Sequence, residues 1–261
     1  MQHITSPGGT RVSYDRYGSG PPLVLVHGSF SDHRTNWEFV KPFFEKKFTV
    51  YALARRGRGE TDATKGHAVE DESRDVSALI ESIEEPIFLL GHSYGAQVAL
   101  GGAANVPDRI RKLVLYEPPW PNIIRSDTLA RLEELAQLGK WHELPVTFFH
   151  ETFSIPVEEL DELRATEHWP PIVADAEASL EELRALSSYI FHAERFQGLH
   201  FPVLLQVGTE SPRDKFVTDT LAAVLSDASI DALSGQAHEG VTMAPDQYAE
   251  SVFRFLVPYK A

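Results

Sequence analysis

The sequence predicts a doubly wound α/β domain with a mainly parallel sheet and a helical insertion. Two short apolar runs, residues 22–28 and 86–93, are rich in Leu and β-branched residues, and each closes on glycine beside a polar residue, which is typical of buried parallel strands. A helix-like stretch follows each run, so strands and helices alternate as βαβ units require. Residues 118–198 break this alternation, because they carry helical patterns and no convincing strand.

The remaining elements follow from the same periodicities. The two glycines at positions 8 and 9 predict an antiparallel hairpin ahead of the first parallel strand, a purely structural edge. The pattern divides the chain into a core of residues 1–117 and 199–261 and an inserted helical cap of residues 118–198. Further core strands are expected at 49–54, 112–116, 203–207 and 229–233, and core helices at 37–45, 69–83, 96–104, 215–225 and 247–256.

Composition narrows the possible functions. The 261 residues include 24 Lys and Arg against 38 Asp and Glu, so the net charge of −14 disfavours nucleic acid and anionic membranes as partners. There is no cysteine, which excludes disulfides, thiolate metal ligands and a thiol nucleophile. No apolar run reaches the roughly 18 residues of a membrane span, and the first residues do not resemble a secretion signal, so we expect a cytoplasmic protein.

The most specific motif is Gly91-His92-Ser93-Tyr94-Gly95, a GxSxG sequence between an apolar strand and a helix of small residues. In this context the motif predicts a sharp strand-to-helix turn that exposes the Ser93 hydroxyl as a nucleophile. The Tyr94 backbone N–H then faces a developing oxyanion. The stretch after the earlier strand, His27-Gly28-Ser29-Phe30, offers a second donor, and the Ser29 N–H is the first choice.

Four motifs together resemble the α/β-hydrolase family, and the resemblance spans nearly the whole chain. They are HG after a strand, RRGRGETD after the next strand, GHSYGA, and a late GQAHEG. The resemblance implies the α/β-hydrolase fold, a serine hydrolase without metal or organic cofactor, and His238 as the base for Ser93. The resemblance also implies that the arginines of RRGRGETD brace the loop after the fourth strand rather than bind an anion.

The sequence leaves two candidates for the acid that supports His238. Most relatives carry Asp a few residues after the strand that follows the insertion, where this chain has Ser211, so the adjacent Glu210 is one candidate. Glu117 is the other, and we favour it. It ends the strand after the elbow helix and precedes two prolines, and this YEPP site resembles the acid position of some dehalogenases and of zearalenone lactone hydrolases.

The expected reaction is hydrolysis of a carboxylic ester or lactone through an acyl-enzyme. Because the insertion is aromatic and offers no obvious cationic clamp, we expect a small, uncharged, partly aromatic substrate, contacted by Phe30, Trp120 and Trp169. C–C bond hydrolysis, acyl transfer and a non-catalytic ligand-binding role on the same fold stay open as alternatives. An Asp nucleophile, which epoxide or dehalogenase chemistry needs, is absent from the motif.

Overall fold

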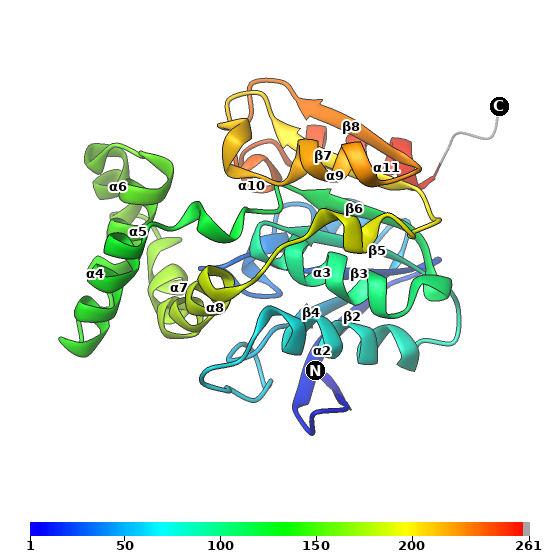
Figure 1. The fold of residues 1–261 in the computed structure, drawn as a ribbon, viewed down its shortest axis with the longest axis horizontal. Coiled ribbons are helices and arrows are strands. Elements are labelled where there is room, and N and C mark those ends of the chain that lie inside the picture. The colour runs from blue at the N-terminus through cyan, green and yellow to red at the C-terminus, as the bar shows by residue number, and fades with distance from the viewer. Residues whose placement is uncertain (258–261) are drawn as a thin grey trace.

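The computed structural model describes residues 1–257 and contains one eight-stranded sheet with the order β1-β2-β4-β3-β5-β6-β7-β8 (Figure 1). The pairs from β4 through β8 are parallel, whereas β2 pairs antiparallel with β1 and with β4. The strands are β1 (Gln2–Thr5), β2 (Arg11–Gly18), β3 (Pro22–Val26), β4 (Thr49–Ala54), β5 (Ile87–His92), β6 (Ile110–Tyr116), β7 (Val203–Gly208) and β8 (Ala228–Leu233). Residues 258–261 of the predicted core lie outside the described residues.

Helices cover both faces of this sheet, and the alternation of side chains along the strands separates two cores. Leu89 and Leu113 face one core with α2 (Val69–Ser82), α3 (Tyr94–Asn105) and α9 (Thr218–Val224). Leu90 and Val114 face the other core with α1 (Lys41–Phe44), α10 (Gly240–Met243) and α11 (Pro245–Leu256). The parallel strands are therefore buried on both sides, which explains their continuous apolar sequence.

The predicted elements are largely confirmed. The strand at 49–54 has the expected bounds, and the elbow helix begins at Tyr94 rather than at residue 96. The stretch at 37–45 is not one helix but a 3-10 turn, η1 (Thr35–Trp37), followed by the short α1. The N-terminal hairpin is present, although β2 lies beside β4 and not beside the first parallel strand.

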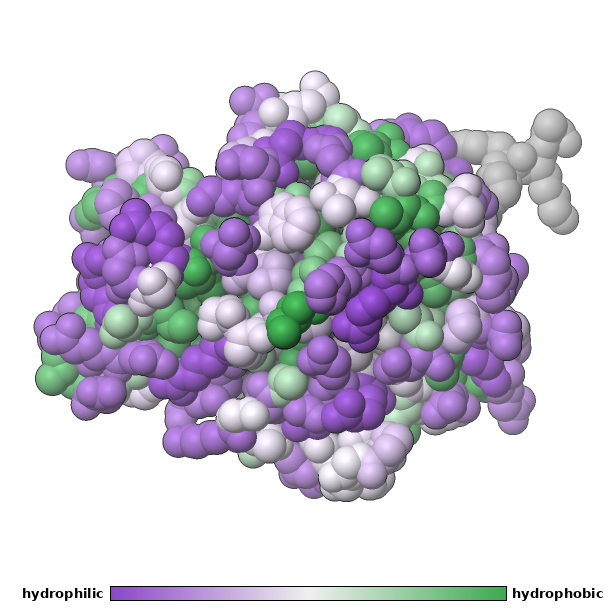
Figure 2. Space-filling view, viewed as in Figure 1, coloured by the Kyte–Doolittle hydropathy of each residue, from purple (hydrophilic) through white to green (hydrophobic). Residues whose placement is uncertain are grey.

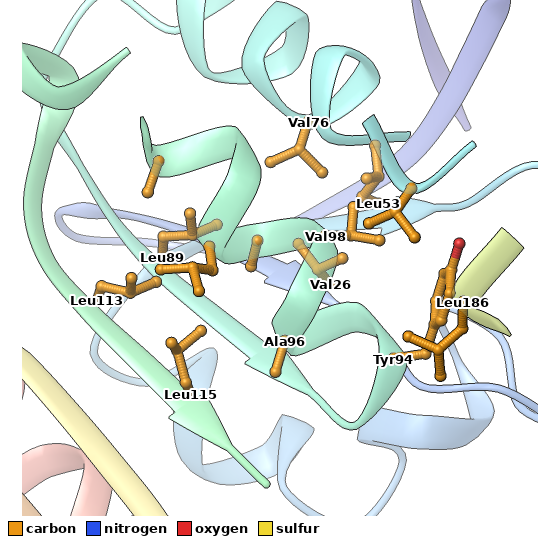
Figure 3. Close-up of a cluster of buried hydrophobic side chains, with 14 of the residues drawn as sticks. Val26, Leu53, Val76, Leu89, Tyr94, Ala96, Val98, Leu113, Leu115 and Leu186 are labelled. Atoms are coloured by element: carbon orange, nitrogen blue, oxygen red, sulfur yellow. The ribbon is translucent and has the colours of Figure 1, made fainter. Parts of the chain in front are cut away.

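Residues 118–198 contribute no strand to the sheet, and residues 193–196 pack against α9 of the core. Residues 126–188 form a helical group beside the sheet (Figure 1). Its helices are α4 (Ser126–Gln137), α5 (Glu143–Phe153), α6 (Val157–Arg164), α7 (Trp169–Ala174) and α8 (Ala176–Ser188). We call residues 118–198 the helical insertion. Helix α8 joins it to the core, since Leu186 and Tyr94 belong to one buried cluster, and Figure 3 shows the two side chains next to each other.

The surface is mostly polar on the face shown in Figure 2. Hydrophilic residues cover most of this face, with hydrophobic residues scattered between them. Within residues 1–257, no helix has the length and apolar character needed to cross a membrane.

Candidate active site

Ser93 lies between β5 and α3 on a strained bend. Its φ and ψ are 56° and −128°, a region that residues other than glycine rarely adopt. The flanking glycines allow this bend: a Cβ on Gly91 would lie 2.6 Å from the Gly95 carbonyl oxygen, and a Cβ on Gly95 would lie 2.1 Å from the His27 carbonyl oxygen. The GxSxG sequence therefore forms the tight strand-to-helix turn that the motif predicts.

A continuous chain of hydrogen bonds joins Ser93, His238 and Glu117. The Ser93 hydroxyl lies 2.8 Å from His238 Nε2, and His238 Nδ1 lies 2.6 Å from Glu117 Oε2. Because an ionised carboxylate can only accept a hydrogen bond, Nδ1 carries the proton and Nε2 is free to accept one from the hydroxyl. In this tautomer the imidazole can remove a proton from Ser93.

Glu117 is held rigidly at the end of β6. Its side chain is fully buried, its φ is 48°, and its N–H donates to the Gln206 carbonyl oxygen at 3.2 Å. The second carboxylate oxygen accepts the Gly208 N–H at 2.8 Å. These contacts with β7 direct the carboxylate toward His238. They also offset the strain of the left-handed backbone conformation at Glu117.

The other acid candidate lies elsewhere. Glu210 is exposed, and its carboxylate accepts a hydrogen bond from the neighbouring Thr209 hydroxyl at 3.0 Å. Both ring nitrogens of His238 are already occupied, one by Ser93 and one by Glu117. The structure thus brings Glu117, and not Glu210, against the imidazole.

The surroundings of His238 set its pKa. Burial alone would lower the pKa, but the hydrogen bond from Nδ1 to Glu117 and the charge of that carboxylate outweigh burial and raise the pKa above its ordinary value. Glu239 adds to the same effect. A raised pKa makes the imidazolium easier to form when the Ser93 proton is transferred.

Aromatic rings pack against the imidazole of His238. Phe153, at the end of α5, stacks on it with a centroid distance of 5.1 Å and an interplanar angle of 23°. Phe216, after β7, lies 5.3 Å away at 11°. The base is therefore in contact with the helical insertion as well as with the core.

His92 contacts the loop that carries His238. Its Nε2 lies 3.0 Å from the His238 carbonyl oxygen, and its Nδ1 lies 3.1 Å from Asn36 Oδ1. Burial lowers the pKa of His92 to about 3, so the neutral ring carries one N–H and donates to one of these oxygens at a time. His92, His238 and Glu239 also bring three potential metal ligands within 4.8 Å of one another, but the two nitrogens of His238 already serve Ser93 and Glu117.

The loop after β3 lies directly beside Ser93. A Cβ on Gly28 would lie 3.1 Å from the Ser93 Cβ, so a side chain at this position would make Ser93 or the loop shift by a few tenths of an ångström. The Gly28 N–H donates to Asn36 Oδ1 at 2.8 Å, and the Phe30 N–H donates to Ser179 Oγ at 2.7 Å. Between them, the Ser29 N–H donates to no protein atom within residues 1–257.

The second predicted donor is Tyr94, the first residue of α3. The N–H groups of a helix's first turn have no intrahelical carbonyl partner, and the positive end of the helix dipole adds to their attraction for an anion. Ser29 follows Gly28, which lies beside Ser93, and Tyr94 is the residue after Ser93, so two backbone N–H groups belong to residues near the nucleophile. That both N–H groups face one point stays a prediction. Such a pair can hold the oxygen of a tetrahedral intermediate.

A buried group of charges lies behind this loop, and we call it the Arg55 cluster. Its members are Arg55, Arg58, Glu72 and Glu182, and each is at most 2% exposed. The Arg55 guanidinium donates to the carbonyl oxygens of His27 and Gly28, both at 2.8 Å, so the arginine braces the loop after β3, whereas the prediction named the loop after the fourth strand. Burial would raise the pKa of Glu72, but Arg55 and the hydrogen bonds from His67 and Tyr94 lower it to about 2.

The predicted substrate contacts are distributed over the interface between insertion and core. Phe30 is 4% exposed and packs against Phe148 and Phe149 of α5. The Trp120 ring lies edge-on to Phe191 at 5.4 Å, and Trp169 is 4% exposed at the start of α7. Neither tryptophan ring packs on His238 within residues 1–257, so their contact with substrate stays a prediction.

Several residues at the site carry no sequence signal of their own. Phe216 lies in a loop that joins β7 to α9, and only the fold brings it to His238. Asn36, in the 3-10 turn η1, accepts hydrogen bonds from the Gly28 N–H and the Ser31 hydroxyl, and its Oδ1 lies 3.1 Å from His92 Nδ1. Phe153 was one of several aromatic residues in the predicted insertion, and nothing in its spacing singled it out.

Comparison with known proteins supports the same fold. The family model described as "Alpha/beta hydrolase family" matches residues 23–251. A solved α/β hydrolase from Sphaerobacter thermophilus DSM 20745 is 30% identical, with a TM-score of 0.84, covering 97% of this chain and 99% of that one. An enol-lactonase from Burkholderia xenovorans LB400 superimposes with a TM-score of 0.81 at 21% identity, covering 98% of this chain and 99% of its own.

Among curated proteins, the pyrrolizixenacetamide deacetylase of Xenorhabdus hominickii is 37% identical over 139 residues, which is 47% of this chain and 52% of the relative. The matched region spans about half the length of this and the other curated relatives. The family model covers most of the chain, and the Sphaerobacter hydrolase matches nearly all of it. The chain therefore belongs to the α/β-hydrolase family.

Proposed function

We propose that this chain is a cofactor-independent serine hydrolase that cleaves carboxylic esters or lactones through an acyl-enzyme. The observation that carries the proposal is the chain from Ser93 Oγ through His238 to Glu117, with contacts of 2.8 and 2.6 Å. A buried carboxylate that fixes the tautomer and orientation of an imidazole beside a serine is the arrangement that activates serine for attack on a carbonyl carbon. We assign Ser93 as nucleophile, His238 as base and Glu117 as acid.

In the first half of the reaction, the Ser93 hydroxyl attacks the carbonyl carbon while its proton passes to His238 Nε2. The negative charge that develops on the carbonyl oxygen is stabilised by the N–H groups of Ser29 and Tyr94, which are fixed before the substrate arrives. Glu117 stabilises the imidazolium without taking its proton. His238 then protonates the leaving alkoxide, and the acyl group remains on Ser93.

In the second half, His238 removes a proton from a water molecule, and the resulting hydroxide attacks the acyl carbon. The same two N–H groups stabilise the second tetrahedral intermediate. Its collapse breaks the bond to Ser93 Oγ, which takes back the proton from His238, so the carboxylic acid is released and the Ser93 hydroxyl is restored. With a lactone the alcohol and the acid are parts of one product. No step uses a metal ion or an organic cofactor.

The aromatic surroundings support an uncharged, partly aromatic substrate. Phe153 and Phe216 pack against the His238 ring, and Phe30 belongs to the loop that offers the oxyanion donor. We propose that the helical insertion acts as a cap over these residues and that Trp120 and Trp169 belong to the same apolar site. A small molecule is the proposed partner, and a cytoplasmic location stays a prediction.

A fluorophosphonate probe and a substrate panel test the proposal together. We expect the probe to label the wild type on Ser93 and to leave Ser93→Ala unlabelled, with turnover lost and the melting temperature retained. The panel consists of aryl acetates, small and macrocyclic lactones, anilides and acyl-CoA. A wild type that does not react with the probe, or a Ser93→Ala variant that keeps substantial activity, would refute the assignment.

The panel also separates the ester and lactone proposal from its alternatives. The deacetylase relative is named for an acetamide substrate, so the anilides are included as amide representatives. Turnover restricted to anilides or acyl-CoA would remove ester and lactone hydrolysis from the proposal while keeping Ser93 as nucleophile. Labelling without turnover of any member would favour C–C bond hydrolysis or acyl transfer, and no labelling would favour a ligand-binding role.

A further inference from the structure

The loop that offers the Ser29 N–H is fixed by side chains of the helical insertion rather than by the core alone. The Ser29 hydroxyl donates to Glu182 Oε2 at 2.6 Å, and the N–H of Phe30 donates to Ser179 Oγ at 2.7 Å. Ser179 and Glu182 lie on α8, about 150 positions further along the chain. Two consecutive loop residues are therefore bound to one turn of a single helix in the insertion.

These two anchors are themselves immobilised. The side chain of Glu182 is 1% exposed, and its Oε1 lies 2.9 Å from Arg55 Nη1 and also contacts the Arg58 guanidinium. Ser179 is fully buried, and its hydroxyl oxygen accepts a second hydrogen bond from Arg58 at 2.8 Å. Arg55 in turn donates to the Gly28 carbonyl oxygen, so the Arg55 cluster binds the loop at two residues, Gly28 and Ser29.

Among residues 28–30, the partners found within residues 1–257 leave the Ser29 N–H for a ligand. The N–H of Gly28 is taken by Asn36 and that of Phe30 by Ser179, whereas Ser29 is held through its hydroxyl. Phe30 has a φ of 55°, so the loop turns sharply at the residue that is hydrogen-bonded to α8. Holding Ser29 by the side chain fixes the direction of its peptide and keeps the N–H unengaged.

We propose that Glu182 and Ser179 are positioning residues, through which the docked α8 sets the Ser29 N–H toward the oxyanion. This inference rests on the proposed function, because it concerns the rate of that reaction. It implies that the insertion takes part in building the site as well as in covering it. If α8 moves away from the core, the loop loses both anchors and the transition state loses one of its two donors.

The energetic consequence appears in turnover rather than in substrate binding. An oxyanion donor is engaged only when charge develops on the carbonyl oxygen, so a misdirected N–H lowers kcat and leaves KM nearly unchanged. Loss of one complete donor costs about 10²- to 10³-fold in kcat. A loosened loop still presents the N–H part of the time, so a smaller loss is expected when one anchor is removed.

The test uses the full chain and an aryl ester that the wild type turns over. Ser29→Ala keeps the backbone N–H but removes the hydroxyl that binds Glu182, and we expect kcat to fall about 10- to 100-fold with KM within about threefold. Ser29→Thr restores a hydroxyl and should recover most of the loss. Ser179→Ala should behave like Ser29→Ala, and Glu182→Gln should lose less, because its amide oxygen can still accept the hydroxyl.

A transition-state analogue distinguishes positioning from a general structural effect. A trifluoromethyl ketone forms a tetrahedral adduct with Ser93 and places an oxyanion in the site, so its inhibition constant should rise in parallel with the fall in kcat. Two variants on exposed positions of α8, Ser188→Ala and Glu177→Gln, serve as matched controls and should leave kcat and the inhibition constant unchanged.

The inference is overturned if Ser29→Ala and Ser179→Ala both keep kcat within about twofold of an active wild type. It is also overturned if kcat falls while the inhibition constant of the ketone stays the same, because the loss would then lie outside the oxyanion. A wild type that neither hydrolyses the ester nor reacts with a fluorophosphonate overturns the proposed function, and the positioning role falls with it.

Discussion

Glu117 and His238 meet across the carboxyl edge of the sheet, with Oε2 and Nδ1 2.6 Å apart, although 121 positions separate them in the chain. Glu117 follows β6 and His238 follows β8, while the strand between them, β7, supplies the Gly208 N–H that fixes the second carboxylate oxygen. The acid is thus built into the sheet two strands away from the base. Ser93 follows β5, so all three residues lie at the carboxyl ends of strands of the same sheet.

This relationship predicts opposite outcomes for the two acids. Glu117→Gln keeps the shape but removes the charge and allows the wrong tautomer of His238, so we expect kcat to fall by about 10³- to 10⁴-fold. Glu210→Gln alters an exposed side chain bonded only to its neighbour and should change kcat less than about twofold. Steady-state kinetics on one aryl ester compares the two, and a large loss in Glu210→Gln with an active Glu117→Gln would reverse the assignment.

The pH dependence of kcat/KM reports on the same pair. His238 must be neutral to act as base, and its pKa is raised above the ordinary 6.5, so activity should rise with pH along a limb whose midpoint exceeds 6.5. In Glu117→Gln the hydrogen bond to a carboxylate and its charge are gone, and burial then lowers the pKa. The residual activity should therefore show its acid limb at lower pH than the wild type, and a limb that does not move would contradict the coupling.

Gly28 is predicted to be intolerant of a side chain because of its distance to the nucleophile. In Gly28→Ala the new Cβ would lie 3.1 Å from the Ser93 Cβ and 3.4 Å from His92 Nδ1, so either Ser93 or the loop must shift. We expect kcat to fall about 10- to 100-fold, since small displacements at a reacting group are costly. Gly198→Ala is the control, because its Cβ would meet no atom within 4 Å. Equal activity of the two variants would refute the close-packing argument.

The sequence predicted the features that local patterns encode, namely the nucleophile, the base and the alternation of strands and helices. Ser93 and His238 each lie in a motif with a strand before it, and the α/β alternation placed both at one edge of the sheet. The choice between Glu117 and Glu210 stayed open, because both follow strands that flank the same edge, and only the packed sheet shows which carboxylate reaches the imidazole. Ser179 and Glu182 were not predicted as site residues, since an amphipathic helix carries no signal of which loop it will bind.

Phe153, a residue of the helical insertion, is predicted to affect kcat by holding the His238 imidazole in place. Its ring stacks on the His238 imidazole at 5.1 Å, and its removal leaves one face of the base less constrained. We expect Phe153→Ala to lower kcat about tenfold and Phe153→Leu to lower it less, because precise placement of the base is part of catalysis. Phe253→Ala removes an equally half-buried ring from the opposite core and should leave kcat unchanged. Unaltered kcat in Phe153→Ala would show that the insertion does not hold the base.

The backbone N–H and the side-chain hydroxyl of Tyr94 are predicted to have different roles, and a single substitution distinguishes them. Its N–H is the proposed oxyanion donor, whereas its buried hydroxyl donates to Glu72 Oε1 at 2.9 Å within the Arg55 cluster. Tyr94→Phe removes only the hydroxyl, so the free energy of unfolding should fall by about 1.5–3 kcal/mol, as for a hydrogen bond to a charged group, while kcat changes less than about threefold. Chemical denaturation and kinetics on the same preparation measure both quantities. A large loss of kcat with unchanged stability would mean that the phenol itself acts in the reaction, since the backbone N–H is the same in both proteins.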